Sequence, residues 1–102
     1  MTDMVGGIYI ITNKINGKIY VGSSVNIHKR WGEHKSGLRN NSNNNIYLQN
    51  DWKKHGEESF DFSVLELTEE CNLLDREQYW MDEYLCYNRK TGYNIASIAG
   101  RN

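Results

Sequence analysis

The pattern of hydrophobic and polar residues along the chain predicts three strands and three helices. Strands are indicated where β-branched and aromatic residues dominate, and helices where apolar residues recur every three or four positions. The predicted strands are residues 7–13, 18–23 and 59–67, and the predicted helices are residues 26–38, 46–55 and 73–86. The order ββααβα predicts an α/β (α+β) fold, a small sandwich whose central three-stranded, mainly antiparallel sheet is flanked by helices.

The first two strands are separated by Asn16-Gly17, the sequence signal of a two-residue hairpin turn. Pairing the strands about this turn places Tyr20 opposite Asn13 and Tyr9 opposite Ser24. Both tyrosines then point to one face, but about 13 Å apart along the strands, which is too far for one compact site. A longer turn or a bulge would bring them closer.

Other residues predict where elements end and which face is buried. Gly56 predicts the end of the second helix. Asn72, followed three residues later by Asp75, predicts the N-cap of the last helix. In the third strand Phe60, Phe62 and Val64 alternate with polar residues, which predicts one buried face.

Composition limits the class of protein. A chain of 102 residues, with 38% hydrophobic and 25% charged residues, is expected to form one globular domain, residues 1–102. The N-terminus lacks the features of a secretory signal, and no apolar run approaches the roughly 20 residues of a membrane span. Cys71 and Cys86 are too few for a disulfide framework and suit a reducing compartment, so we expect a cytoplasmic protein.

Charge is distributed unevenly although the formal net charge is −1. Residues 1–55 contain eight Lys/Arg and three Asp/Glu, a balance of +5, and residues 56–102 contain four Lys/Arg and ten Asp/Glu, a balance of −6. A basic half can face a polyanion, although a charge block is more often a solvated face. A chain without overall positive charge is expected to bind nucleic acid weakly.

Glu77 interrupts the apolar stripe of the last helix. The stripe comprises Leu73, Leu74, Trp80, Met81, Tyr84 and Leu85, and helical spacing places Glu77 within it. A carboxylate there needs a partner. It can reach water at the stripe edge, pair with an arginine, or bind a divalent cation, because Mg²⁺ is often held by one or two carboxylates with waters and phosphate oxygens.

Arg30 and His34 are spaced i,i+4 on the first predicted helix and so share one face. They suit a solvated basic face, or a phosphate clamp beside a proton carrier. Gly22 leaves a bare spot on the strand face that carries Tyr9 and Tyr20, where a ligand backbone could approach. Zinc-ligand spacings, a glycine-rich phosphate loop and a Gly-x-Ser-x-Gly elbow are all missing from the sequence.

The residues singled out above, taken in their order along the chain, resemble the motifs of the GIY-YIG endonuclease family. Gly7-Ile8-Tyr9 corresponds to the first motif and Tyr20-Val21-Gly22 to the second, with valine in place of the usual isoleucine. Arg30 and His34 follow on the next helix, Glu77 on a helix after the third strand, and Gly92-Tyr93-Asn94 ends the pattern. The resemblance covers residues 6–95 and is greatest to the catalytic domain of phage and group I intron homing endonucleases.

The resemblance implies a phosphodiester hydrolase that uses one Mg²⁺ or Mn²⁺ ion per active site. In family terms Glu77 holds the metal, Arg30 neutralises the scissile phosphate, and Tyr9 or Tyr20 orients or deprotonates the attacking water. His34 assists the proton transfer, and Asn94 holds the local hydrogen-bond network. A phenol has a pKa of about 10, so a tyrosine base requires a depressed pKa, for which Arg30 and the metal are the expected cause.

The implied partner is double-stranded DNA in a bacterial host or phage-infected cell, without a membrane partner. The expected DNA contacts are Gly22, Lys18, Lys29, Lys35, Arg39, Lys53 and Lys54. Homing endonucleases of this branch usually carry a separate DNA-binding region after the nuclease domain, so this chain is either a small stand-alone nuclease or a catalytic domain without that region.

Three alternatives remain at this stage. One is a restriction or repair-type nuclease of the same family, and another is a DNA-binding module that keeps the fold without catalysis. The third is an interaction domain in which the tyrosines and Glu77 are structural. In that case Glu77 is expected to be exposed or salt-bridged, rather than to face Tyr9, Tyr20 and Arg30 across a groove.

Overall fold

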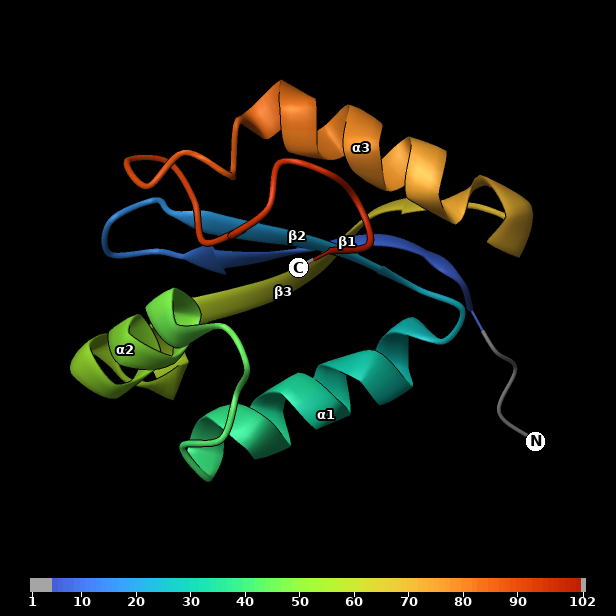
Figure 1. The fold of residues 1–102 in the computed structure, drawn as a ribbon. Helices are drawn as coiled ribbons and strands as arrows, with labels where there is room; N and C mark the ends of the chain where they lie inside the picture. The colour runs from blue at the N-terminus through green and yellow to red at the C-terminus, as the bar shows by residue number, and fades with distance from the viewer. Residues whose placement is uncertain (1–4, 102) are drawn as a thin grey trace.

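The computed structural model describes residues 5–101 and has the predicted order of elements (Figure 1). Two short 3₁₀ helices, η1 and η2, precede β3 and α3. The elements are β1 Gly7–Asn13, β2 Ile19–Ser24, α1 Ile27–Arg39, α2 Ile46–His55, η1 Glu57–Ser59, β3 Phe60–Leu67, η2 Glu70–Asn72 and α3 Leu73–Tyr84. Helices and strands thus agree with the sequence interpretation to within two residues at each end.

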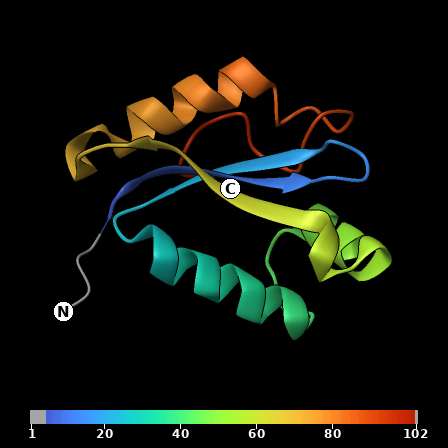
Figure 2. The same ribbon diagram turned by 180° about the vertical axis from the view of Figure 1, so that it is seen from behind.

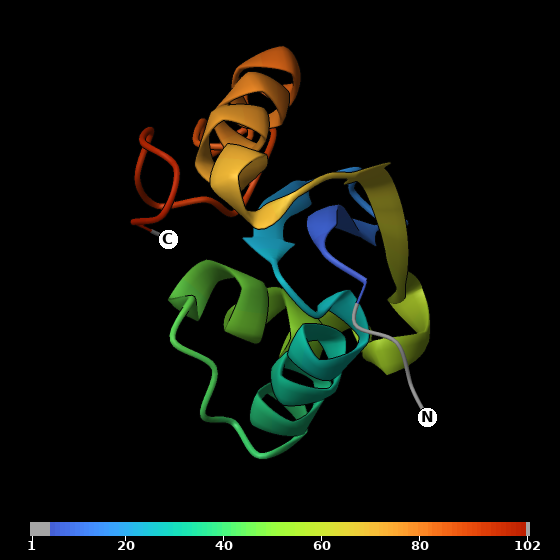
Figure 3. The ribbon, with the colours of Figure 1, turned by 90° about the vertical axis from the view of Figure 1, so that its right-hand side faces the viewer.

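The sheet is antiparallel, with strand order β2-β1-β3, and it separates two hydrophobic cores. Helices α1 and α2 cover one face and α3 covers the other, as the two opposite views and the end view show (Figures 1, 2 and 3). Alternation along β1 supplies both cores, because Tyr9 and Ile11 pack toward α1 and α2 whereas Ile8 and Ile10 pack toward α3. The predicted α+β sandwich is confirmed.

The hairpin register differs from the predicted one. Tyr9 pairs with Gly22, and Tyr20 pairs with Ile11 rather than with Asn13. The turn is longer than two residues, since the Asn13 amide donates to the Lys18 carbonyl at 2.9 Å and Gly17 alone of the turn pair has a positive φ, 77°. With this shift in register, the ring centroids of Tyr9 and Tyr20 lie 6.4 Å apart. The longer turn therefore supplies the closer approach that a compact site needs.

Helix ends follow the predicted signals in part. Gly56, with φ 87°, ends α2 as predicted. Asn72 occupies the N-cap position of α3 as predicted, but its side chain makes no capping hydrogen bond, and the chain enters the helix through η2. Helix α3 ends at Tyr84, two residues earlier than predicted, where Leu85 adopts φ 50°.

The buried faces of α3 and β3 are narrower than the sequence pattern predicts. Met81 is fully buried, but Leu74, Tyr84 and Leu85 of the predicted stripe are exposed. On β3 Phe60 and Phe62 join the core beneath α1 and α2, whereas Val64 is 43% exposed although it is in register with Tyr9. The apolar faces of these two elements therefore extend beyond the area that their neighbours cover.

The segment after α3 returns to the edge strand and pairs with it. Ile19 and Gly92 form a parallel bridge, and a Cβ at position 92 would lie 2.2 Å from the Cys86 carbonyl oxygen, so only glycine fits there. The fully buried Asn94 accepts a hydrogen bond from the Val21 amide and donates to the Val21 carbonyl, both at 2.9 Å. Its side chain thus satisfies backbone groups that the outer edge of β2 would otherwise leave unpaired.

Replacing Asn94 with alanine should destabilise the fold. The change leaves the Val21 amide and carbonyl without their partner, which we expect to lower the free energy of unfolding by about 2–4 kcal/mol. Urea unfolding followed by circular dichroism measures the effect. Asn50→Ala, at an exposed position of α2, is the control and should change the stability by less than about 0.5 kcal/mol. Equal stability of the two variants would contradict this role.

Candidate active site

A cleft opens at the outer edge of β2, where residues from both faces of the sheet meet. Glu77 comes from α3 on one face, and Arg30 comes from α1 on the other. The lining residues are Tyr9, Tyr20, Gly22, Ser23, Arg30, Glu77 and Gly100. The structure therefore brings together four of the six residues that the sequence analysis assigned to catalysis.

Glu77 is buried, and it forms no ion pair with a cationic group of residues 5–101. Only 4% of its surface is exposed. The Ser23 hydroxyl donates to Oε1, and the Gly100 amide lies 3.5 Å from Oε2. Within residues 5–101 the ion pairs are Arg30–Glu33, Arg39–Glu57 and Arg76–Glu66, none of which includes Glu77. A buried carboxylate in this position favours a cation in the cleft.

Gly22 allows Tyr9 to reach the cleft. A Cβ at position 22 would lie 2.4 Å from the Tyr9 hydroxyl oxygen, so any larger residue would displace the phenol. The space that glycine leaves is filled by Tyr9 rather than by a ligand backbone. The expectation that Gly22 offers a bare spot for DNA is therefore wrong, although Gly22 lines the cleft.

Burial controls the protonation of the two tyrosines. It raises the pKa of Tyr9 well above its ordinary value, and the Tyr20 hydroxyl adds to the effect. Burial also raises the pKa of Tyr20 to about 12. Arg30 lowers both values, as expected, but by less than burial raises them. Arg30 alone therefore does not bring either pKa below its ordinary value, and both phenols are neutral at pH 7. The contribution of a metal to a depressed pKa stays a prediction.

Arg30 and His34 occupy different environments although they lie one turn apart. The Arg30 side chain is 43% exposed and lies 3.3 Å from Glu33. His34 is buried, and its Nε2 lies 2.9 Å from the Tyr9 hydroxyl oxygen. Burial and the nearby Arg30 charge lower the pKa of His34 to about 4. His34 is therefore a neutral imidazole at pH 7, not part of a solvated basic face.

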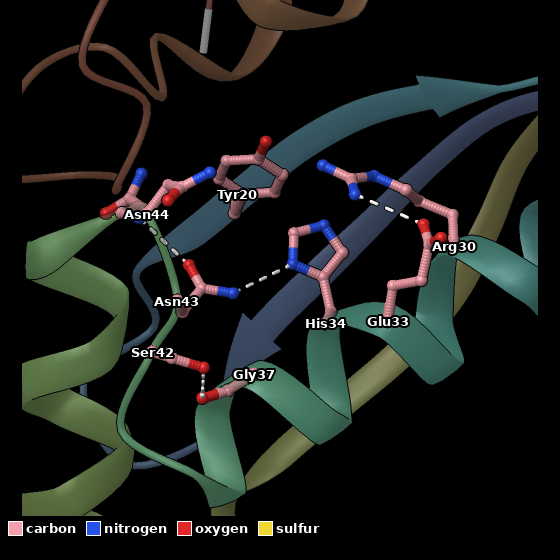
Figure 4. A pocket seen from close by; sticks show the side chains of 9 residues that line it. Tyr20, Arg30, Glu33, His34, Gly37, Ser42, Asn43 and Asn44 are labelled. Carbon is pink, nitrogen blue, oxygen red and sulfur yellow. Dashed lines mark hydrogen bonds and ion pairs between the residues drawn. The ribbon is translucent and has the colours of Figure 1, made fainter.

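A second pocket shares Tyr20 and Arg30 with the cleft, and Figure 4 shows the residues that line it. It lies between α1 and the loop that leads to α2. Its lining residues are Tyr20, Arg30, Glu33, His34, Gly37, Ser42, Asn43, Asn44 and Asn45. Residues 42–45 of this loop, a serine and three asparagines, are therefore part of the site region. No role was predicted for them, nor for Ser23 and Gly100, since nothing in their residue types indicates these contacts.

The basic residues that are expected to contact DNA have different surroundings. Lys29 shares a surface pocket with Arg30, and Lys18 borders another with Asp51. Lys35 lies 4.9 Å from the Phe62 ring, and Arg39 forms two hydrogen bonds with Glu57, at 2.7 and 2.6 Å. Lys53 and Lys54 are exposed near the end of α2. Of these six basic residues, Lys29 shares a described pocket with Arg30, and Arg39 is already paired with Glu57. The DNA contacts themselves stay a prediction.

Comparisons with known proteins agree with the fold and with the resemblance to the GIY-YIG family. The sequence model of the GIY-YIG catalytic domain family matches residues 5–94 of this chain. Intron-associated endonuclease 1 of Enterobacteria phage T4 is 39% identical over 95 residues, which cover 91% of this chain and 38% of that protein. The chain thus spans well under half the length of this relative.

Two solved structures are similar to the chain as a whole. A point mutant of the catalytic domain of intron endonuclease I-TevI is 38% identical, with a TM-score of 0.83, and the match covers 92% of this chain and 96% of that one. The catalytic domain of homing endonuclease I-TevI is also 38% identical, with a TM-score of 0.80, and the match covers 89% and 98% of the two chains.

Burial of His34 should make the stability of the protein depend on pH. The imidazole has a pKa of about 6.5 in an unfolded chain and about 4 in the folded protein. Between these values the unfolded state binds more protons, so the free energy of unfolding falls as the pH is lowered, by about 2 kcal/mol from pH 7 to pH 5. Urea unfolding across this range measures the slope.

A pair of matched substitutions identifies the histidine responsible. His34→Gln removes the titrating group and should flatten the slope between pH 7 and pH 5. His28→Gln replaces an exposed histidine of the same helix and should leave it unchanged. If both variants keep the slope of the unmodified protein, another group is responsible.

Proposed function

The chain belongs to the GIY-YIG endonuclease family, and we propose that it hydrolyses phosphodiester bonds of double-stranded DNA with the help of a divalent cation. The observation that carries the proposal is the buried Glu77 carboxylate, which forms no ion pair within residues 5–101 and shares a cleft with Arg30 and two tyrosines. A carboxylate and an arginine on opposite walls suit a metal ion and a phosphate group respectively. An interaction domain with a structural Glu77 would instead pair or expose that side chain.

The residues of the cleft fit a single Mg²⁺ or Mn²⁺ ion. Nucleases of this family generally depend on a metal. Glu77 offers one carboxylate whose Oε1 is held by Ser23, and Mg²⁺ typically takes one or two carboxylates and keeps several waters. When bound, the ion supplies a positive charge that stabilises the oxygen leaving the phosphorus.

The remaining residues would bind and orient the substrate. Arg30 neutralises the scissile phosphate, because its half-exposed guanidinium borders both the cleft and the adjoining pocket. Tyr9 and Tyr20, as neutral phenols, orient the attacking water or the phosphate by hydrogen bonds, and we assign the water to Tyr9. Asn94 acts from outside the cleft, because it holds β2, the strand that carries Tyr20 and Gly22.

The reaction would take place where DNA is accessible, in the cytoplasm of a bacterial host or a phage-infected cell. Helices that are long and apolar enough to cross a membrane do not occur within residues 5–101. A separate DNA-binding region of the kind that homing endonucleases carry would select the target, while the present residues would supply the cleavage.

Replacing Glu77 with glutamine should keep the fold and abolish cleavage. The amide is nearly isosteric but lacks the charge that binds a hard cation. We expect a loss of several kcal/mol of transition-state stabilisation, which corresponds to at least about a 100-fold slower rate. Nicking of supercoiled plasmid in Mg²⁺, Mn²⁺ or chelator measures it, and chelator should stop the unmodified protein.

Glu83→Gln is the matched control, because it removes the same charge from an exposed position of α3. It should cleave at the rate of the unmodified protein. Retained cleavage by Glu77→Gln would refute the role of Glu77. Binding of DNA without metal-dependent nicking by the unmodified protein would favour the non-catalytic module.

DNA binding by this chain should be weak and strongly dependent on salt. Few unpaired basic side chains border the cleft, so we expect a Kd of about 10⁻⁴–10⁻⁶ M for any duplex at physiological salt, the range of non-specific binding. Fluorescence anisotropy with chelator present, from 50 to 200 mM salt, measures the affinity. A linked DNA-reading domain should raise it through effective concentration.

Two basic residues make a matched pair for this measurement. Lys29→Ala removes a cation next to Arg30 and should weaken binding equally for all sequences and reduce the salt slope by about one unit. Arg39→Ala removes a cation already paired with Glu57 and should have little effect. Tight, salt-insensitive binding of one short sequence would contradict the proposal.

A further inference from the structure

The loop between α1 and α2 contacts the side of His34 that faces away from Tyr9. The Asn43 amide nitrogen Nδ2 lies 3.3 Å from His34 Nδ1, as the dashed line in Figure 4 shows. The other ring nitrogen, Nε2, lies 2.9 Å from the Tyr9 hydroxyl oxygen. His34 thus lies in a chain of hydrogen bonds that runs from Asn43 to the cleft.

The orientation of the Asn43 amide is determined by its own partners. Its oxygen, Oδ1, accepts the backbone amide hydrogen of Asn45 at 2.9 Å. Its backbone amide donates to the Gln49 side chain at 3.0 Å, and the buried Gln49 is held in turn by the Leu38 carbonyl at 3.0 Å. The oxygen end is therefore occupied, and the nitrogen end, which can only donate, faces His34.

A donor on one side of a neutral imidazole places the ring proton on the other side. Because Asn43 donates to Nδ1, that nitrogen carries the lone pair and Nε2 carries the hydrogen. Nε2 then donates to the Tyr9 oxygen, and His34 in this form cannot accept the Tyr9 proton. The expected assistance of His34 in proton transfer therefore becomes donation of a hydrogen bond to Tyr9.

We propose that Asn43 is a positioning residue that holds His34 as the Nε2–H tautomer and so leaves the Tyr9 hydroxyl hydrogen free for the substrate. The Tyr9 oxygen accepts from His34, and its own O–H points into the cleft that Arg30 and Glu77 line. There it donates to a phosphate oxygen or holds the attacking water. The role in catalysis rests on the proposed function, whereas the tautomer does not.

The tautomer can be tested without activity. Long-range ¹H–¹⁵N NMR of the imidazoles at pH 7 separates a protonated from an unprotonated ring nitrogen, because the latter resonates far downfield. The unmodified protein should show His34 with unprotonated Nδ1 and protonated Nε2. The opposite pattern would overturn the proposal, whether or not any variant folds.

Asn43→Asp reverses the polarity of the contact with minimal change in shape. One carboxylate oxygen still accepts the Asn45 amide, and the other faces Nδ1 and should draw a proton onto it. Asn41→Asp adds the same charge at an exposed position of the same loop, outside the pocket lining, and should leave the His34 spectrum unchanged. Unprotonated Nδ1 in a folded Asn43→Asp protein would overturn the proposal.

Cleavage then separates the two claims. Asn43→Asp should lower kcat for plasmid nicking by at least about tenfold, since a wrong histidine tautomer costs more than this in serine proteases, while Asn41→Asp should match the unmodified protein. If Asn43→Asp has a protonated Nδ1 and the kcat of the unmodified protein, the catalytic role of Asn43 is refuted and the proposed nuclease function is not. A correct tautomer in a protein that never cleaves DNA would support the hydrogen-bond assignment and refute the nuclease function.

Discussion

Glycine at position 22 is the constraint on which the site depends. The cleft lies at the edge of a sheet whose two faces have separate cores, and its residues come from both. Only the missing side chain at Gly22 lets the Tyr9 hydroxyl approach the edge where Glu77 arrives from α3. An edge strand is usually an unprotected margin of a sheet. Here Glu77, from one face of the sheet, lines the same cleft at this edge as Arg30 and the two tyrosines from the other face.

Burial gives the site its chemical character. The phenols of Tyr9 and Tyr20 and the imidazole of His34 are all held in their neutral forms, because water is largely excluded from them. The charges that remain in the cleft are those of Arg30 and Glu77, one from each side of the sheet. This arrangement matches a substrate that has negative phosphates and is accompanied by a divalent cation. The neutral hydrogen-bond donors around the two charges can orient such a substrate without changing the net charge of the cleft.

Asparagine side chains hold the framework in places where regular secondary structure leaves backbone groups unpaired. Asn94 pairs with the backbone of Val21 on the sheet edge. Asn45 caps α2 through the Leu48 amide at 3.0 Å and also donates to the Tyr93 carbonyl at 2.7 Å, which ties the loop before α2 to the segment after α3. Asn43 continues this framework to His34. A tract that reads as a polar loop is therefore part of the support of the site.

Four features could be inferred from the sequence because each depends on residues close together in the chain: the order of elements, the turn region, the end of α2 and the anomaly of Glu77. Hydrophobic periodicity, glycine conformation and a charge within an apolar stripe are local properties. Only the tertiary structure decided the hairpin register, the burial of His34 and the partners of the basic residues. A shift of two residues in register preserves which face each side chain occupies, so the pattern could not distinguish a two-residue turn from a longer one. His34 and Arg39 look alike on a helix until Tyr9 from β1 buries one and Glu57 pairs with the other, because those partners lie 25 and 18 residues away in sequence.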